Sequence, residues 1–127
     1  MDKKKAYLFL RVPDRNTPKS VIRKTVVEME QFASQDYEIL KTVVKLGNTR
    51  YSSDAVDPDF LKEIKESQCD ILIVRSFFSI STKEIELRVL YSNLNEANIN
   101  CISMTDCMDL CNYLYYQNTY KGDLQYE

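Results

Sequence analysis

Five consecutive apolar or aromatic residues, Ala6 to Leu10, follow three lysines near the start of the chain. A strand with one face in water alternates apolar and polar residues, whereas a strand that is covered on both faces is apolar throughout. The run therefore predicts a buried strand of a parallel sheet. Ligands collect at the carboxyl ends of such strands in open α/β sheets, and this strand ends in Arg11, Val12 and Pro13.

Three further apolar runs have the length and composition of strands, and stretches with apolar residues at helical spacing separate them. We expect these strands at residues 37–44, 71–74 and 98–104. The run at 71–74 is the most apolar of them, so we expect it at the centre of the sheet. We expect helices to begin at Ser20 or at Thr17-Pro18, at Pro58 with Asp57 as the cap, at Ser81 or Thr82, and near Asp106.

This β-α-β-α-β-α-β-α order predicts an α/β fold. We expect a three-layer sandwich, in which a mostly parallel central sheet of about four strands is flanked by helices. The chain has 127 residues, which is enough to bury a core without disulfides or metals. We expect one domain over residues 1–117 and a polar tail over residues 118–127.

Arginines follow three of the expected strands, at the sheet edge where ligands are expected. An arginine can hold a phosphate through two parallel hydrogen bonds. The alternative is that these are solvated strand ends with serines that cap helices. The candidate phosphate-binding or DNA-binding residues are Arg11, Arg15, Arg50 and Arg75.

Two segments that follow expected strands are predicted to be loops. Residues 47–57 are mostly polar, and we expect them to form a surface loop with a candidate role in function. Residues 75–82 form the second expected loop. This loop holds the adjacent Phe77 and Phe78, which we expect to pack rather than bind.

The residue types that are missing exclude several kinds of chemistry. The chain has no histidine, so it cannot form a Ser-His-Asp or Cys-His catalytic group or the usual histidine-bearing zinc site. Its two glycines cannot form a glycine-rich phosphate-binding loop. Four cysteines show no C-x-x-C spacing, and we expect buried free thiols, no metal and no cofactor. They are Cys69, Cys101, Cys107 and Cys111.

The formal net charge is −2, which is unfavourable for a protein that binds nucleic acid alone, because phosphate contacts supply most non-specific affinity. The charge is unevenly distributed. Residues 1–25 hold eight basic and two acidic residues, a net charge of +6, while residues 96–127 hold one basic and five acidic residues, a net charge of −4.

No apolar run approaches the roughly 20 residues of a membrane span, and no signal peptide is evident. These features predict a cytoplasmic protein with no membrane partner.

Several segments resemble the catalytic domain of the serine recombinases, the resolvase/invertase family, in the same order and spacing over about residues 4–112. Residues 6–13 look like that family's opening strand, which ends in Arg-Val-Ser, and residues 20–32 look like its first helix. Residues 57–64 are similar to its Arg-Pro-x-Leu-x-x-Leu-Leu segment. Residues 70–74 resemble the strand before its Asp-Arg-Leu-x-Arg motif, and residues 99–106 resemble the following strand.

The resemblance implies an ancestor in which a serine attacks a DNA phosphodiester while arginines stabilise the transferring phosphoryl group. Arg11 falls on the arginine before that serine, and Pro13 falls on the serine itself. In the second motif, Phe78 falls on the aspartate, and Ser79 and Thr82 fall on the two arginines. Loss of the nucleophile together with these arginines implies a catalytically inactive relative.

The same resemblance implies other losses. The family carries a long helix after the last strand, which builds its dimer, and a separate DNA-binding domain. Only about twenty residues follow Asp106 here, so we expect both to be missing.

Three functions remain open. The first is an inactive accessory or regulator in DNA recombination or in a mobile element. The second is a protein-interaction module without a DNA role, for which exposed tyrosines are favourable. The third is an enzyme that uses Ser52, Ser53 or Ser79 as its nucleophile. The partners left open are DNA, an active recombinase or another protein, and a second copy of the chain. The tyrosines are Tyr113, Tyr115, Tyr116, Tyr120 and Tyr126.

Overall fold

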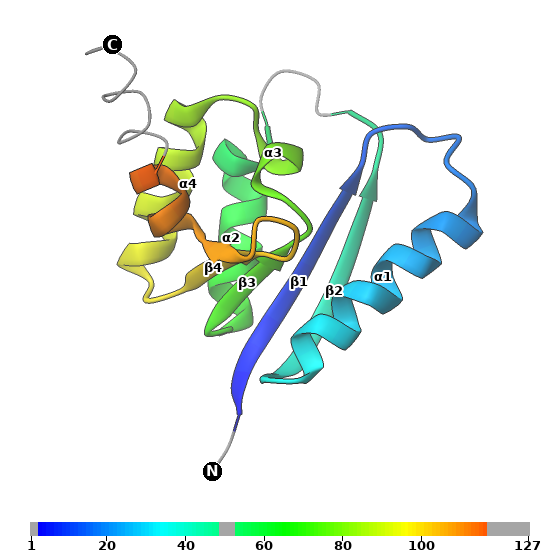
Figure 1. Cartoon of the computed structure of the whole chain (residues 1–127). Coiled ribbons are helices and arrows are strands. Elements are labelled where there is room, and N and C mark those ends of the chain that lie inside the picture. Colours follow the sequence, from blue (N-terminus) through cyan, green and yellow to red (C-terminus); the bar gives the residue numbers. More distant parts are fainter. Residues whose placement is uncertain (1–2, 49–52, 117–127) are drawn as a thin grey trace.

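The computed structural model describes residues 3–48 and 53–116 (Figure 1). The expected tail at 118–127 lies outside these residues, as do Arg50 and Ser52. A final helix begins at Leu110 and continues to Tyr116, where the described residues end. The elements before it are β1 (Lys4–Val12), α1 (Lys19–Ser34), β2 (Tyr37–Leu46), the 3-10 helix η1 (Asp54–Val56), α2 (Pro58–Ser67), β3 (Ile71–Val74), α3 (Phe77–Ile80), α4 (Glu84–Glu96), β4 (Asn100–Ser103) and β5 (Met108–Asp109).

The strands form a single sheet in the order β2-β1-β3-β4-β5. The first four strands in that order are parallel, and β5 is antiparallel to β4. The α/β fold with a mostly parallel sheet is therefore confirmed, and β3 is the central strand as expected. The sheet has five strands rather than about four, because the chain reverses at Cys107, whose φ is 55°, and Met108 then pairs with Ser103. The expected helix near Asp106 consequently begins only at Leu110.

Two apolar cores lie on opposite faces of the sheet. Along β1, Tyr7 and Phe9 point to the face that α2 and α4 cover, and Leu8 points to the face that α1 covers. Figure 1 shows α1 on one side of β1 and β2, and α2 and α4 on the other side of the sheet. This arrangement explains the uninterrupted apolar run, since burial of each large apolar side chain stabilises the fold by about 1.5–3 kcal/mol.

Helix α2 begins as the sequence predicts. The Asp57 side chain accepts a hydrogen bond from the Asp59 backbone N–H, and Pro58 occupies the first turn, where its missing N–H has no cost. The helix buries the Phe60 ring against Phe9, with 4.5 Å between the ring centroids. It ends at Gln68, which has left-handed backbone angles.

Both expected loops contain short helices. In the first, Asp54 and Ala55 of η1 are buried, so the prediction of a polar surface loop is wrong for this part of it. In the second, Phe77 of α3 packs against Tyr113, but Phe78 is 70% exposed. The prediction that both phenylalanines pack is wrong, because adjacent helical positions are about 100° apart and only one of them can face the core.

The cysteines divide into two groups. Cys69 and Cys101 are buried free thiols, as expected, whereas Cys107 and Cys111 are free but exposed. The reason is that Cys107 lies in the turn before β5, and Cys111 lies on the outer side of the final helix. Within the described ranges, no helix is long and apolar enough to cross a membrane.

Candidate functional site

The carboxyl ends of β1, β2, β3 and β4 share one edge of the sheet because these strands are parallel. Backbone hydrogen bonds continue beyond the strand ends: the Gly47 N–H donates to the Val12 carbonyl at 2.7 Å, and the Thr105 N–H donates to the Arg75 carbonyl at 2.9 Å. The strand order turns back at β1, so β1 and β3 flank the switch point where such sheets bind ligands.

On the β2 side of this edge, Arg11 forms three hydrogen bonds inside the protein. Its Nε donates to Asp54 Oδ2 at 2.9 Å, and its Nη2 donates to Asp54 Oδ1 at 2.6 Å. Its Nη1 donates to the Gly47 carbonyl at 3.0 Å. The Arg11 side chain is 14% exposed and the Asp54 side chain is 1% exposed. We name these three residues the ion-pair corner.

The ion-pair corner is a structural tie between the end of β1 and η1. A buried charge is costly unless it is paired and hydrogen-bonded, and here both carboxylate oxygens of Asp54 are occupied by the guanidinium fork. Arg11 uses three of its five N–H donors inside the protein. From the sequence, Arg11 is a candidate phosphate contact and Asp54 is not identified as its partner, because residues so far apart along the chain form no local pattern that pairs them.

Arg15 lies beside the same corner. A Cβ atom added to Gly47 would lie 2.6 Å from Arg15 Nε, so the arginine side chain passes directly over this glycine. Gly47 also has a φ of +91°, which L-residues rarely adopt. Arg15 is exposed, and together with Pro13, Asp14, Gly47 and Asn48 it lines a shallow pocket of about 490 Å³.

Between β1 and β3 the edge is hollowed into a groove of about 450 Å³. We name it the open groove. One part of its lining is apolar and comes from the end of β1 and the first turns of α1, and the other carries hydroxyl groups and Arg75. The lining residues are Leu10, Arg11, Val12, Pro13, Thr17, Val21, Ile22, Thr25, Arg75, Ser76, Ser79 and Thr105.

Arg75 differs from Arg11 in its surroundings. Its side chain is exposed, and within the described residues its guanidinium forms no hydrogen bond or ion pair. Only its backbone carbonyl is engaged, by the hydroxyls of Ser103 at 3.1 Å and Thr105 at 2.8 Å. Arg75 is therefore an exposed cation on the lining of the open groove.

Local hydrogen bonds hold α3, which forms one wall of the open groove. Ser76 Oγ accepts from the Ser79 N–H at 3.1 Å, and Ser79 Oγ donates to the Ser76 carbonyl at 2.7 Å. Asp106 Oδ2 accepts from the Phe77 N–H at 3.2 Å. In the described part of the chain, the Ser79 hydroxyl donates to the Ser76 backbone carbonyl and not to a carboxylate of the kind that activates a serine nucleophile.

Ser53 does have a carboxylate partner. Its hydroxyl donates to Glu86 Oε1 at 2.9 Å, and the Ser81 hydroxyl donates to the same oxygen at 2.6 Å. The bonds from Ser81 and then Ser53 lower the pKa of Glu86. A lowered pKa makes Glu86 a weaker base, and the geometry fits an anchor between η1 and α4 better than an activated serine.

The four candidate arginines thus divide between different environments. Arg11 and Arg15 meet at Gly47, and Arg11 and Arg75 both line the open groove. Arg50 lies outside the described residues. Pro13, at the position where the resemblance places the serine nucleophile, lies on the lining of the open groove.

Comparison with known proteins supports the fold. The chain is similar to the N-terminal catalytic domain of TP901-1 integrase, with a TM-score of 0.71 and 16% sequence identity over 96% of this chain and 99% of that one. It is also similar to a resolvase family site-specific recombinase from Streptococcus pneumoniae, with a TM-score of 0.69 and 18% identity over 97% of each chain. No model of a known protein family matches the chain, and no curated protein matches its sequence. The chain therefore has the fold of a resolvase-like catalytic domain.

Proposed function

We propose that this protein uses a recombinase fold without cutting DNA, as an accessory or regulator in DNA recombination or in a mobile element. The observation that carries the proposal is the buried pair of Arg11 with Asp54. A cleaving site needs a nucleophile and cations that are free to stabilise the transferring phosphoryl group. Here Pro13 offers no hydroxyl, and Arg11, two residues earlier, is already neutralised by a carboxylate of the same chain.

Contact with nucleic acid remains compatible with this edge. Arg75 supplies a cation with no ion pair among the described residues, and Ser76 and Thr105 line the same groove. Phosphate contacts by arginine and by hydroxyl side chains position a protein on DNA without any chemistry. We therefore assign Arg75 and Arg15, which line different pockets of this edge, to phosphate contact, and we assign Arg11 to the fold.

The test is an adduct assay with labelled supercoiled and nicked DNA, performed on the wild-type protein and on Pro13→Ser. Neither should form a covalent protein–DNA link, because restoring the hydroxyl leaves Arg11 paired with Asp54. In parallel, a titration with duplex DNA at low and near-physiological salt should show binding that weakens in Arg75→Ala. A covalent adduct with the wild-type protein would overturn the proposal.

A second candidate function is a protein-interaction module, and a groove of about 620 Å³ between α2 and α4 favours it. Pro58 and Leu61 line it from α2, and Val89 lines it from α4. Ile85, one turn before Val89, is also exposed. If the protein binds neither DNA at either salt concentration nor an active recombinase, but binds another protein in a way that Val89→Asp abolishes, this second function replaces the first.

A further inference from the structure

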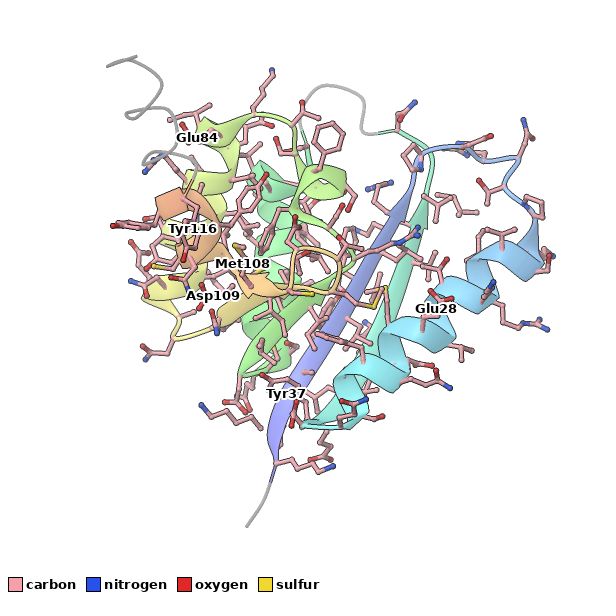
Figure 2. The ribbon with its side chains drawn as sticks, viewed as in Figure 1. Glu28, Tyr37, Glu84, Met108, Asp109 and Tyr116 are labelled. Carbon is pink, nitrogen blue, oxygen red and sulfur yellow. The ribbon has the colours of Figure 1, made fainter. Side chains whose placement is uncertain are left out.

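The two outer strands of the sheet differ in what they leave unpaired. β2 ends the sheet on one side with ten residues, and β5 ends it on the other with two. Figure 2 shows Met108 and Asp109 of β5 on the opposite side of the view from Glu28 of α1, the helix that packs on β2. Among the described residues, only β1 pairs with β2. A long outer strand of this kind is a template for a strand of another chain.

The features that usually block an outer strand do not block β2. Proteins protect such strands with proline or with lysines that point outward, and β2 contains no proline. Its two lysines are engaged with α2: Lys41 Nζ donates to Glu63 Oε1 at 3.0 Å, and Lys45 Nζ lies 5.5 Å from the centroid of the Phe60 ring. Both ammonium groups therefore lie over one face of the sheet instead of guarding its outer side.

A bulge in β2 decides which of its residues share a face. The register between β1 and β2 shifts between Ala6 and Tyr7, so β2 contains one extra residue, Leu40. In a regular strand, Glu38 and Lys45 would point to opposite faces, because they are an odd number of positions apart. The extra residue places both of them on the face that α2 covers. One face of β2 thus carries a carboxylate near one end and an ammonium group near the other.

We propose that β2 pairs antiparallel with β2 of a second copy of this chain, around a two-fold axis at Thr42. The inference concerns a surface that the proposed function does not use. In this register, Glu38 of one copy lies directly opposite Lys45 of the other, and opposite charges in such positions stabilise paired strands. Because a two-fold axis uses the same surface twice, the charge pair forms twice.

The same register matches apolar side chains on the other face of the sheet, which α1 covers. Ile39 of one copy lies opposite Val44 of the other, and both of these side chains already pack against the core on that face. Tyr37 lies opposite Leu46, which is 45% exposed in the single chain. Apolar pairs across two strands add to the stability of the pairing.

The neighbouring registers bring like charges together. With the axis at Lys41, this lysine lies opposite the same lysine of the second copy. With the axis at Val43, Lys41 lies opposite Lys45. Like charges directly opposite each other destabilise paired strands, so the axis at Thr42 is favoured over both alternatives.

Helix α1 runs beside the proposed axis. Thr42 Oγ1 donates to Glu30 Oε2 at 2.9 Å, which places Glu30 of α1 next to Thr42. Val27 lies one turn earlier on the same side of the helix and is 44% exposed, so the second copy's α1 adds apolar contact there. The two Glu30 carboxylates come close together across the axis, and their repulsion limits the affinity of the dimer.

The test is sedimentation velocity of the full chain over a range of concentrations, without DNA. The protein should shift from monomer to dimer as its concentration rises. Glu38→Lys should weaken the dimer about tenfold, because an attractive pair becomes a repulsive one at two symmetric positions. The double variant Glu38→Lys/Lys45→Glu reverses the pair and should restore the dimer. Glu38 is exposed, so Glu38→Lys should keep the wild-type urea unfolding transition.

Two further variants test the register and the specificity of the effect. Glu30→Gln removes the like charges at the axis and keeps an acceptor for Thr42, so it should tighten the dimer. Glu96→Lys is the matched control, because it makes the same change of charge at an exposed position of α4, on the face of the sheet away from α1. It should leave the dimer unchanged.

A protein that stays monomeric at every concentration would overturn the inference. A dimer that Glu38→Lys does not weaken would do the same, as would a folded double variant that fails to restore the dimer. Each of these results leaves the proposed function standing, because the DNA titration and its Arg75→Ala variant do not involve β2.

Discussion

The ion-pair corner and the open groove lie on the same edge of one sheet, and each contains an arginine that follows a strand. In the corner, Asp54 brings a buried carboxylate to Arg11 and closes the site. In the groove, Ser76 and Ser79 form hydrogen bonds with each other, and among the described residues no carboxylate pairs with Arg75. The comparison teaches that an arginine at a strand end is available to a ligand only if the chain does not supply its counter-ion.

The largest expected effect is the removal of one partner of the corner. Asp54→Ala or Arg11→Ala should lower the free energy of unfolding by about 3–5 kcal/mol, because each leaves an uncompensated buried charge. The double variant Arg11→Met/Asp54→Leu should regain most of this loss, since an apolar pair of similar size carries no such charge. Urea unfolding measures all of these variants. Losses below about 1 kcal/mol in both single variants would show that the pair is not structural.

Gly47→Ala should have the next largest effect. The substitution places a Cβ against Arg15 and forces alanine into a positive φ, which together should cost about 1–3 kcal/mol. Adding Arg15→Ala removes the steric contact but not the backbone strain, so it should recover only part of the loss. Full recovery in this double variant, measured by urea unfolding, would mean that the backbone conformation at Gly47 is unstrained.

A smaller effect concerns the second anchor of η1, the bond from Ser53 to Glu86. The pKa of Glu86 is lowered in the folded protein, so Glu86 contributes stability above its ordinary pKa. That contribution is lost as the pH falls through the lowered value. Glu86→Gln should therefore flatten the decline of stability on the acid side, and Ser81→Ala should shift the decline to higher pH. Identical acid unfolding curves for Glu86→Gln and wild type would contradict this role.

The smallest effect on stability should come from Arg75→Ala, because its side chain is exposed and forms no ion pair with the residues that the structure describes. The free energy of unfolding should change by no more than about 0.5 kcal/mol. If Arg75 contacts one phosphate, the salt dependence of nucleic-acid binding should decrease by about one unit of slope. Arg88→Ala on α4, where Arg88 pairs with Glu84, is the matched control and should leave the slope unchanged.

The spacing of apolar residues predicted the sheet and its helices well. This spacing indicates which side chains are buried, and their burial decides which element forms. The apolar run of β1, the cap at Asp57 and the central position of β3 are all local or compositional signals. The missed features depend on chain reversal or on long-range contacts. Met108 joins the sheet because of the turn at Cys107, and Phe78 is exposed because Phe77 takes the place in the core.

At the candidate site, the sequence predicted which edge of the sheet carries the arginines, but it did not show which arginine pairs with a carboxylate. The pairing of Arg11 with Asp54 joins residues that are 43 positions apart, and a polar segment gave no sign that one carboxylate in it would be buried. The open groove could be anticipated only as the strand-order switch between β1 and β3. Its lining by Val21 and Ile22 depends on how α1 crosses the sheet.

The most direct test compares the two arginines in one titration. Nucleic-acid binding is measured for the wild type, for Arg75→Ala and for Arg11→Met/Asp54→Leu, which removes the corner's cation and its counter-ion together. The account predicts that Arg75→Ala weakens binding and that the corner double variant binds like the wild type. Loss of binding in the double variant, with Arg75→Ala unchanged, would contradict the division between a closed corner and an open groove.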